Sequence, residues 1–273
     1  MIANTMNFFW GGEAMSWMRF LTLKSFCHFN PDWDVQLWMG RQFEVSDYWD
    51  TKESQDFMGY IGADYMIRVA ELPVTVMQFD SPWPQLDELT PVHESDLFRW
   101  WLLSKESGWY ADMDILWTAP MVSSESSVAT CQAGGNFAIG LLGSDGESRF
   151  YHDVLQKALL RVSNADYQSG GTKSVNEVLT GQQNTIHVPN VPRLIKGKYG
   201  CKLDELPEST VYPWHYPKID RVFLENFEVP DTTVGIHWYA GTTLAQKFNT
   251  YAERDVLGVT PETTFSKYAR RVL

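Results

Sequence analysis

The chain has 273 residues, of which 44% are hydrophobic, so it can bury a large core and fits one sizeable domain or two small ones. Its formal net charge of -12 repels a phosphate backbone, so we expect no nucleic-acid partner. Its apolar runs are far shorter than the roughly 18 to 20 residues of a membrane span, and residues 1–10 lack the pattern of a signal peptide. We therefore expect a cytoplasmic, soluble protein with no transmembrane segment, which could still attach peripherally to a membrane.

Short strand-like runs alternate with helical stretches along the chain, which favours an α/β architecture. The pattern predicts a strand at residues 6–10 that ends at Gly11 and Gly12, an amphipathic helix at 16–29 and a second strand at 34–39. A β-α-β opening of this kind presents a nucleotide pocket at the carboxyl ends of its strands.

The rest of the chain continues this alternation. Three prolines make residues 80–91 a loop. We expect helices at residues 44–70, 94–105 and 149–162, a last helix that begins at Pro261, and extended segments at 74–79, 128–132, 136–140, 211–217 and 234–238.

Two aspartates, Asp112 and Asp114, stand at the end of a short apolar run, where a strand would deliver them to a cleft. Neighbouring acids in an acidic chain are costly without a cation between them, and hard divalent cations take oxygen ligands. The spacing alone is weak evidence, because it arises by chance about once in such a chain. A second copy, Asp32 and Asp34, follows Asn-Pro in a turn and is interpreted as structural.

Four further candidate residues, Asp96, Arg99, His237 and Trp10, also have ordinary structural explanations. Asp96 and Arg99 share one face of the helix expected at 94–105 and could form an exposed ion pair of little energetic value. His237 lies in a strand-like run, where a lone histidine is usually a hydrogen-bonded core residue. Trp10 could be a core tryptophan, although the glycines after it allow close approach of a ligand to the backbone.

In their order and spacing, these motifs resemble the sugar-binding region, with its DXD motif, of the family 32 glycosyltransferases. They are more distantly similar to the glucosyltransferase domain of the large clostridial toxins. The segments that carry the resemblance are FFWGG at 8–12, NPDW at 30–33, SDLFR at 95–99, GWYADMD at 108–114, TG at 180–181 and GIHW at 235–238.

The resemblance implies a GT-A type α/β fold, with a Rossmann-like nucleotide-binding sheet and flanking helices. It also implies a single catalytic domain over residues 1–273. In such a domain, residues 1–120 would mainly bind the nucleotide sugar, and residues 121–273 would form the acceptor side and complete the active site.

By the same resemblance, Asp112 and Asp114 hold Mn²⁺ or Mg²⁺, and Asp112 contacts the metal directly, through water, or contacts the ribose instead. His237 completes either the metal site or the diphosphate site. Trp10, next to Gly11, stacks on the nucleobase.

The donor sugar would be held by a second group of residues. The resemblance places Asp96 and Arg99 on the sugar, where a carboxylate and a guanidinium together orient its hydroxyl groups. Asn136, which follows two glycines, is expected to touch the sugar or the reaction centre.

The resulting hypothesis is a metal-dependent hexosyltransferase with a nucleotide-sugar donor, in which the metal stabilises the departing diphosphate. A UDP-sugar is favoured over GDP-mannose, and the acceptor would be a glycan, a lipid-linked molecule or a protein, as in polysaccharide biosynthesis. The resemblance implies retention of the anomeric configuration. Two alternatives stay open: a metal-dependent phosphohydrolase of haloacid-dehalogenase type, and a non-catalytic sugar-binding protein.

Overall fold

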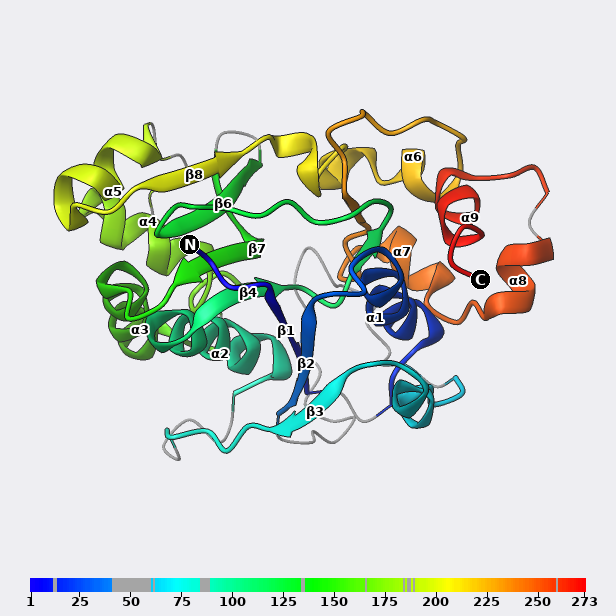
Figure 1. Cartoon of the computed structure of the whole chain (residues 1–273), viewed down its shortest axis with the longest axis horizontal. Helices are drawn as coiled ribbons and strands as arrows, with labels where there is room; N and C mark the ends of the chain where they lie inside the picture. The colour runs from blue at the N-terminus through cyan, green and yellow to red at the C-terminus, as the bar shows by residue number, and fades with distance from the viewer. Residues whose placement is uncertain are drawn as a thin grey trace.

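The computed structural model describes residues 1–11, 14–40, 60, 62–83, 89–133, 136–164, 166–183, 185, 188, 190–258 and 260–273. Over these residues the predicted α/β architecture is confirmed: a mainly parallel central sheet is flanked by helices (Figure 1). None of the described helices combines the length and the apolar character needed to cross a membrane.

The described strands form a seven-stranded sheet in the order β3-β2-β1-β4-β7-β6-β8. All neighbouring pairs are parallel except those made by β7, which runs antiparallel to both β4 and β6. The strands of this sheet are β1 (Thr5–Trp10), β2 (Asp34–Met39), β3 (Thr75–Gln78), β4 (Ser107–Ala111), β6 (Val128–Ala133), β7 (Asn136–Asp145) and β8 (Leu203–Leu206).

A second sheet pairs β5 (Ile115–Trp117) with β9 (Gly235–His237) in antiparallel orientation. Strand β5 closely follows the central strand β4, because only residues 112–114 separate the two. Its pairing with β9 therefore joins the end of β4 to a segment about 120 residues further along the chain.

Helices cover the central sheet and one end of the molecule. The helices α2 (Pro91–Lys105) and α3 (Arg149–Arg161) pack against each other, and α3 packs on α4 (Thr172–Thr180). Figure 1 shows the last four helices gathered near the C-terminus, at the opposite end from α5 (Val191–Tyr199). They are α6 (Asp220–Phe223), α7 (Thr243–Phe248), α8 (Glu253–Gly258) and α9 (Thr264–Ala269).

The predicted β-α-β opening is confirmed by β1, α1 (Trp17–Phe29) and β2. Ser16 caps α1 by accepting a hydrogen bond from the backbone N–H of Arg19, as a serine before a helix favours. The helix predicted at 94–105 begins earlier, at Pro91, because Thr90 supplies the N-cap and proline suits the first turn.

Two sequence predictions are wrong. Residues 211–217 are not extended: they lie between and within two 3-10 turns (Glu208–Thr210 and Tyr216–Lys218), and prolines in this stretch cannot donate to a strand ladder. The final helix does not begin at Pro261 but at Thr264, where Thr263 and Ser266 form a capping box.

The helix predicted at 44–70 falls mostly outside the described residues, and its described end contains a 3-10 helix (Met66–Glu71). The sequence prediction missed β8 and the helices α4, α5, α6, α7 and α8.

The central sheet separates two hydrophobic cores. Phe8 and Trp109 belong to the core that contains α1, whereas the next residues in each strand, Phe9 and Tyr110, belong to the core that contains α2, α3 and α4. Successive side chains of a strand point to opposite faces, so nearly continuous apolar strands are buried on both sides. This burial on both faces holds in place the carboxyl end of β4, which carries the site residues.

A buried amide connects three strands of the sheet. Asn7 is 3% exposed; its Nδ2 donates to the carbonyl oxygen of Trp109 at 3.0 Å, and its Oδ1 accepts from the indole N–H of Trp38 at 2.9 Å. Both partners would lose a hydrogen bond if the amide were removed.

We expect Asn7→Ala to lower the free energy of unfolding by about 1–3 kcal/mol, because it leaves buried polar groups without partners. Urea unfolding followed by tryptophan fluorescence would measure this loss. Gln36→Ala is the control, since Gln36 donates only to the exposed Asp34 carboxylate, and its effect should stay within about 0.5 kcal/mol. Equal stability of the two variants would contradict the prediction.

Candidate functional site

Three sequence-predicted residues meet at the carboxyl end of β4. Asp112 directly follows β4, Asp114 directly precedes β5, and His237 is the last residue of β9. The β5–β9 register pairs Ile115 with His237, which brings the histidine beside the two acids. One ligand atom from each of the three residues lies within 4.8 Å of the others, so the group could hold a metal ion.

The contacts within this triad of Asp112, Asp114 and His237 are short. Nε2 of His237 lies 3.3 Å from Oδ1 of Asp114 and 3.7 Å from Oδ2 of Asp112. The other Asp114 oxygen, Oδ2, accepts the backbone N–H of Ala240 at 2.8 Å, which fixes the orientation of this carboxylate. Two carboxylates and an imidazole form a donor set suited to Mn²⁺, and the oxygen donors also suit Mg²⁺.

The ring of His237 is held by the backbone. The N–H of Tyr239 donates to Nδ1 at 3.3 Å, so the neutral ring carries its hydrogen on Nε2, facing the carboxylates. Burial opposes charging of the ring, but the carboxylates of Asp114 and Asp112 outweigh burial and raise the pKa of His237. Coordination through Nε2 would release that hydrogen, whereas a hydrogen bond to a phosphate would use it.

Arg99 connects the triad to α2. Its guanidinium lies 3.1 Å from the Asp96 carboxylate and 3.2 Å from Oδ1 of Asp112, and it donates to the carbonyl oxygen of Ile139 at 2.8 Å. Burial favours the neutral form of Asp112, but Arg99 and His237 lower the pKa of this acid to about 2. Burial raises the pKa of Asp96 to about 7, because Arg99 offsets the burial only in part and the Asp112 charge adds to it. The Arg99 guanidinium thus contacts two carboxylates, of which Asp112 has a lowered pKa and Asp96 a raised pKa.

Asp96 and Arg99 are nearly inaccessible, since each side chain is 4% exposed. A Cβ added to Gly171 would lie 2.9 Å from Oδ2 of Asp96, so the turn before α4 closes over this acid. The sequence correctly predicts that Asp96 and Arg99 share a face and interact. Contact of this pair with a donor sugar stays a prediction.

The sequence analysis missed the roles of Tyr212 and Gly140 in the site. The hydroxyl group of Tyr212 accepts the N–H of Gly140 at 3.1 Å, and the ring of Tyr212 lies 5.1 Å from that of His237. Tyr212 belongs to the segment wrongly predicted as extended, so no local pattern indicated its role. Tyr110, by contrast, is part of the resemblance, and its hydroxyl group donates to Oδ1 of Asp112 at 2.9 Å.

The remaining predicted residues lie at the same edge of the sheet. Trp10 ends β1, which runs parallel to β4, and the buried Gly11 follows it, while Gly12 lies outside the described residues. Asn136 begins the antiparallel β7, and the pairing of Ala111 with Leu141 places Asn136 beyond the carboxyl end of β4. The structure therefore brings the backbone positions of Trp10 and Asn136 to the edge that carries Asp112.

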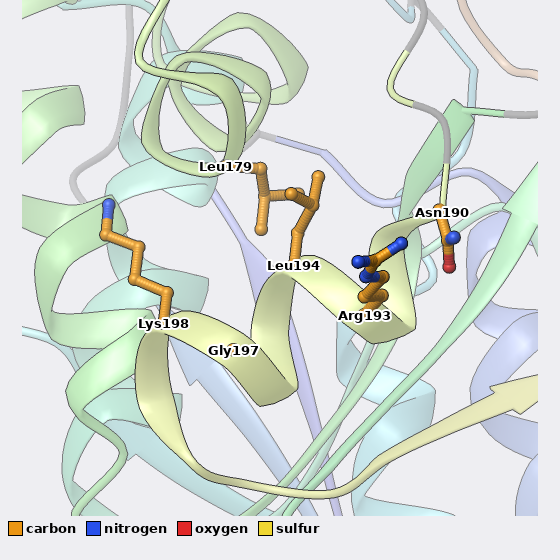
Figure 2. A pocket seen from close by; sticks show the side chains of 6 residues that line it. All are labelled: Leu179, Asn190, Arg193, Leu194, Gly197 and Lys198. Carbon is orange, nitrogen blue, oxygen red and sulfur yellow. The ribbon is translucent and has the colours of Figure 1, made fainter.

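A separate cavity of about 480 Å³ lies between α4 and α5. Figure 2 shows Arg193, Leu194 and Lys198 around it, all carried by α5. None of its lining residues belongs to the triad or to the strands that carry it. This cavity is therefore not the site formed by the sequence motifs.

Comparisons with known proteins find similarity only at the level of solved structures. No protein-family model matches the sequence, and no curated protein matches it. One similar structure, the PaToxG glycosyltransferase, is 13% identical, with a TM-score of 0.48 over 66% of this chain and 68% of that chain. Another is the apo-form glycosyltransferase GlyE of Streptococcus pneumoniae TIGR4, 12% identical, with a TM-score of 0.46 over 99% of this chain and 60% of that chain. With both TM-scores below 0.5, the function must be argued from the residues of the site.

We expect Gly140→Ala to weaken Mn²⁺ binding about tenfold or more, because the added Cβ would lie 2.5 Å from the Tyr212 hydroxyl and 2.8 Å from Oδ2 of Asp112. Titration of Mn²⁺ followed by electron paramagnetic resonance would measure the affinity. Gly197→Ala is the matched control, since nothing lies within 4 Å of its added Cβ. Unchanged Mn²⁺ affinity in a folded Gly140→Ala protein would contradict the prediction.

Asp96→Asn should change how stability depends on pH. With a folded-state pKa of about 7 against an ordinary 3.8, wild-type Asp96 holds a proton that the unfolded chain has lost, so its contribution to stability falls as pH rises between these values. The asparagine variant lacks this loss, so its stability relative to wild type should rise across that window, by up to about 1.4 kcal/mol per pH unit. Urea unfolding at several pH values would test this, and parallel curves for the two proteins would show that the carboxyl group ionises normally.

Proposed function

We propose that this chain is a metal-dependent glycosyltransferase that moves a hexose from a nucleotide sugar to a hydroxyl acceptor. The observation that carries the proposal is the convergence of Asp112, Asp114 and His237 at the carboxyl edge of a mainly parallel sheet. Ligands of open α/β sheets bind at that edge. Trp10 lies at the same edge and offers an aromatic face for the base.

A bound Mn²⁺ or Mg²⁺ would neutralise charge that develops on the departing nucleoside diphosphate. Asp112 and Asp114 are suited to hold such an ion, because Arg99 and His237 keep Asp112 ionised and the Ala240 N–H fixes Asp114. His237 either completes the ligand set through Nε2 or donates its Nε2 hydrogen to a phosphate oxygen.

In this proposal Arg99 and Asp96 position the donor sugar from α2, and Asn136 touches the sugar or the reaction centre from the start of β7. Arg99 is held in place by its bonds to both acids and to the Ile139 carbonyl oxygen, so the direction of its guanidinium is fixed before a sugar binds. We place the donor mainly on residues 1–120 and the acceptor mainly on residues 121–273 of one catalytic domain. A UDP-sugar is our preferred donor, ahead of GDP-mannose, and a glycan, lipid-linked molecule or protein is the acceptor, with retention at the anomeric carbon.

The test is a panel of UDP-glucose, UDP-galactose, UDP-N-acetylglucosamine and GDP-mannose, each with Mn²⁺ or with a chelator. Slow hydrolysis of one donor should release its nucleoside diphosphate only when the metal is present. Asp114→Asn should lower this rate about 100-fold or more, because loss of a metal ligand removes several kcal/mol of transition-state stabilisation.

The control is Asp32→Asn, which removes an aspartate from the turn copy of the motif and should leave the rate unchanged. Retained turnover in a folded Asp114→Asn protein would refute the proposed site. Metal-dependent phosphate release from a simple phosphomonoester would favour a phosphohydrolase instead. Sugar binding that is unaffected by a chelator, without turnover, would favour a non-catalytic sugar-binding protein.

A further inference from the structure

Arg19 lies between two tryptophans that come from different parts of the chain. It belongs to the first turns of α1 and is partly exposed. Its guanidinium carbon lies 5.5 Å from the ring centroid of Trp10 and 5.2 Å from that of Trp238. Both distances are within the range of a cation–π contact, so the two rings together fix the position of the guanidinium.

The two tryptophans mark the two ends of the proposed donor site. Trp10 is the candidate platform for the nucleobase at the end of β1. Trp238 directly follows His237, and its backbone N–H donates to the carbonyl oxygen of Asp114 at 2.9 Å. The Arg19 guanidinium therefore lies between the ring proposed for the base and the ring of the residue that follows His237. A diphosphate that joins a base on Trp10 to a metal on Asp114 would pass close to this guanidinium.

The hydrogen-bonding groups of this guanidinium are not used by the protein. Among the residues that the structure describes, the Arg19 side chain has neither an acidic partner nor a hydrogen-bond acceptor within contact distance, whereas Arg99 is bonded to Asp96, Asp112 and two backbone carbonyl oxygens. A planar guanidinium has five N–H donors in a fork that matches two phosphate oxygens.

We propose that Arg19 binds the diphosphate of the nucleotide donor, beside the metal held by Asp112 and Asp114. This inference rests on the proposed glycosyltransferase function. Arg19 contributes binding of the anionic diphosphate in the bound donor and in the nucleoside diphosphate product, and the rings of Trp10 and Trp238 hold it in the required orientation. Binding of the uncharged parts of the donor does not depend on Arg19.

The experiment compares the binding of UDP, UMP and uridine by isothermal titration calorimetry in the presence of Mn²⁺. Arg19→Gln should weaken UDP binding about tenfold to 100-fold, since charge-assisted hydrogen bonds to phosphate are lost, and should leave uridine binding unchanged. Arg19→Lys keeps the charge without the planar fork, so it should retain part of the preference for UDP over uridine.

The matched control is Arg271→Gln. Arg271 also contacts an aromatic ring, with its guanidinium carbon 4.2 Å from the ring centroid of Tyr268, but it lies near the C-terminus, outside the site. This variant should bind all three ligands as the wild type does. Near-ultraviolet circular dichroism would establish that each variant is folded.

The outcomes separate the two proposals. If the wild type binds UDP with Mn²⁺ and folded Arg19→Gln binds it equally well, the role of Arg19 is wrong and the proposed function stands. An equal loss of UDP and uridine binding would make Arg19 a support for Trp10 rather than a diphosphate ligand, and would overturn the inference. If the wild type binds neither UDP nor GDP in the presence of Mn²⁺, both proposals fail.

Discussion

The antiparallel pairing of β5 with β9 is the constraint on which the rest of the site depends. Three paired positions place His237 opposite Ile115, and two of the three residues that follow β9, Trp238 and Ala240, donate their backbone N–H groups to Asp114. These backbone bonds leave the side chains of Asp114 and His237 little freedom to move apart. Because β5 begins immediately after the Asp-x-Asp motif, the same pairing also fixes that motif against the end of β4.

Electrostatics explains why such a site can exist in an acidic protein. Asp96, Asp112 and Asp114 lie close together, and burying several carboxylates without compensation would destabilise the fold. The buried Arg99 guanidinium lies beside Asp96 and Asp112. The ring of His237 lies beside Asp112 and Asp114. The compensation is incomplete, since burial still raises the pKa of Asp96.

The aromatic residues of the chain serve the fold and the site together. Six of the eleven tryptophans that the structure describes are buried in the two cores on either side of the sheet, as large apolar side chains often are. The buried Trp238 and the partly buried Trp10 also contact Arg19. Arg19 of α1 therefore links the end of β1 to the segment that follows β9.

The sequence by itself determined the elements whose signals are local. The periodicity of β1, α1 and β2, the shared face of Asp96 and Arg99, and the position of Asp112 and Asp114 after a strand could all be read from neighbouring residues. Tertiary structure alone decided the contact between Tyr212 and Gly140, the pairing of β6 with β8 and the start of α9. It also distinguished the two Asp-x-Asp copies, because it placed His237 beside Asp112 and Asp114. The physical reason is that helix caps and apolar periodicity act within a few residues, whereas strand pairing joins segments whose separation along the chain leaves no local pattern.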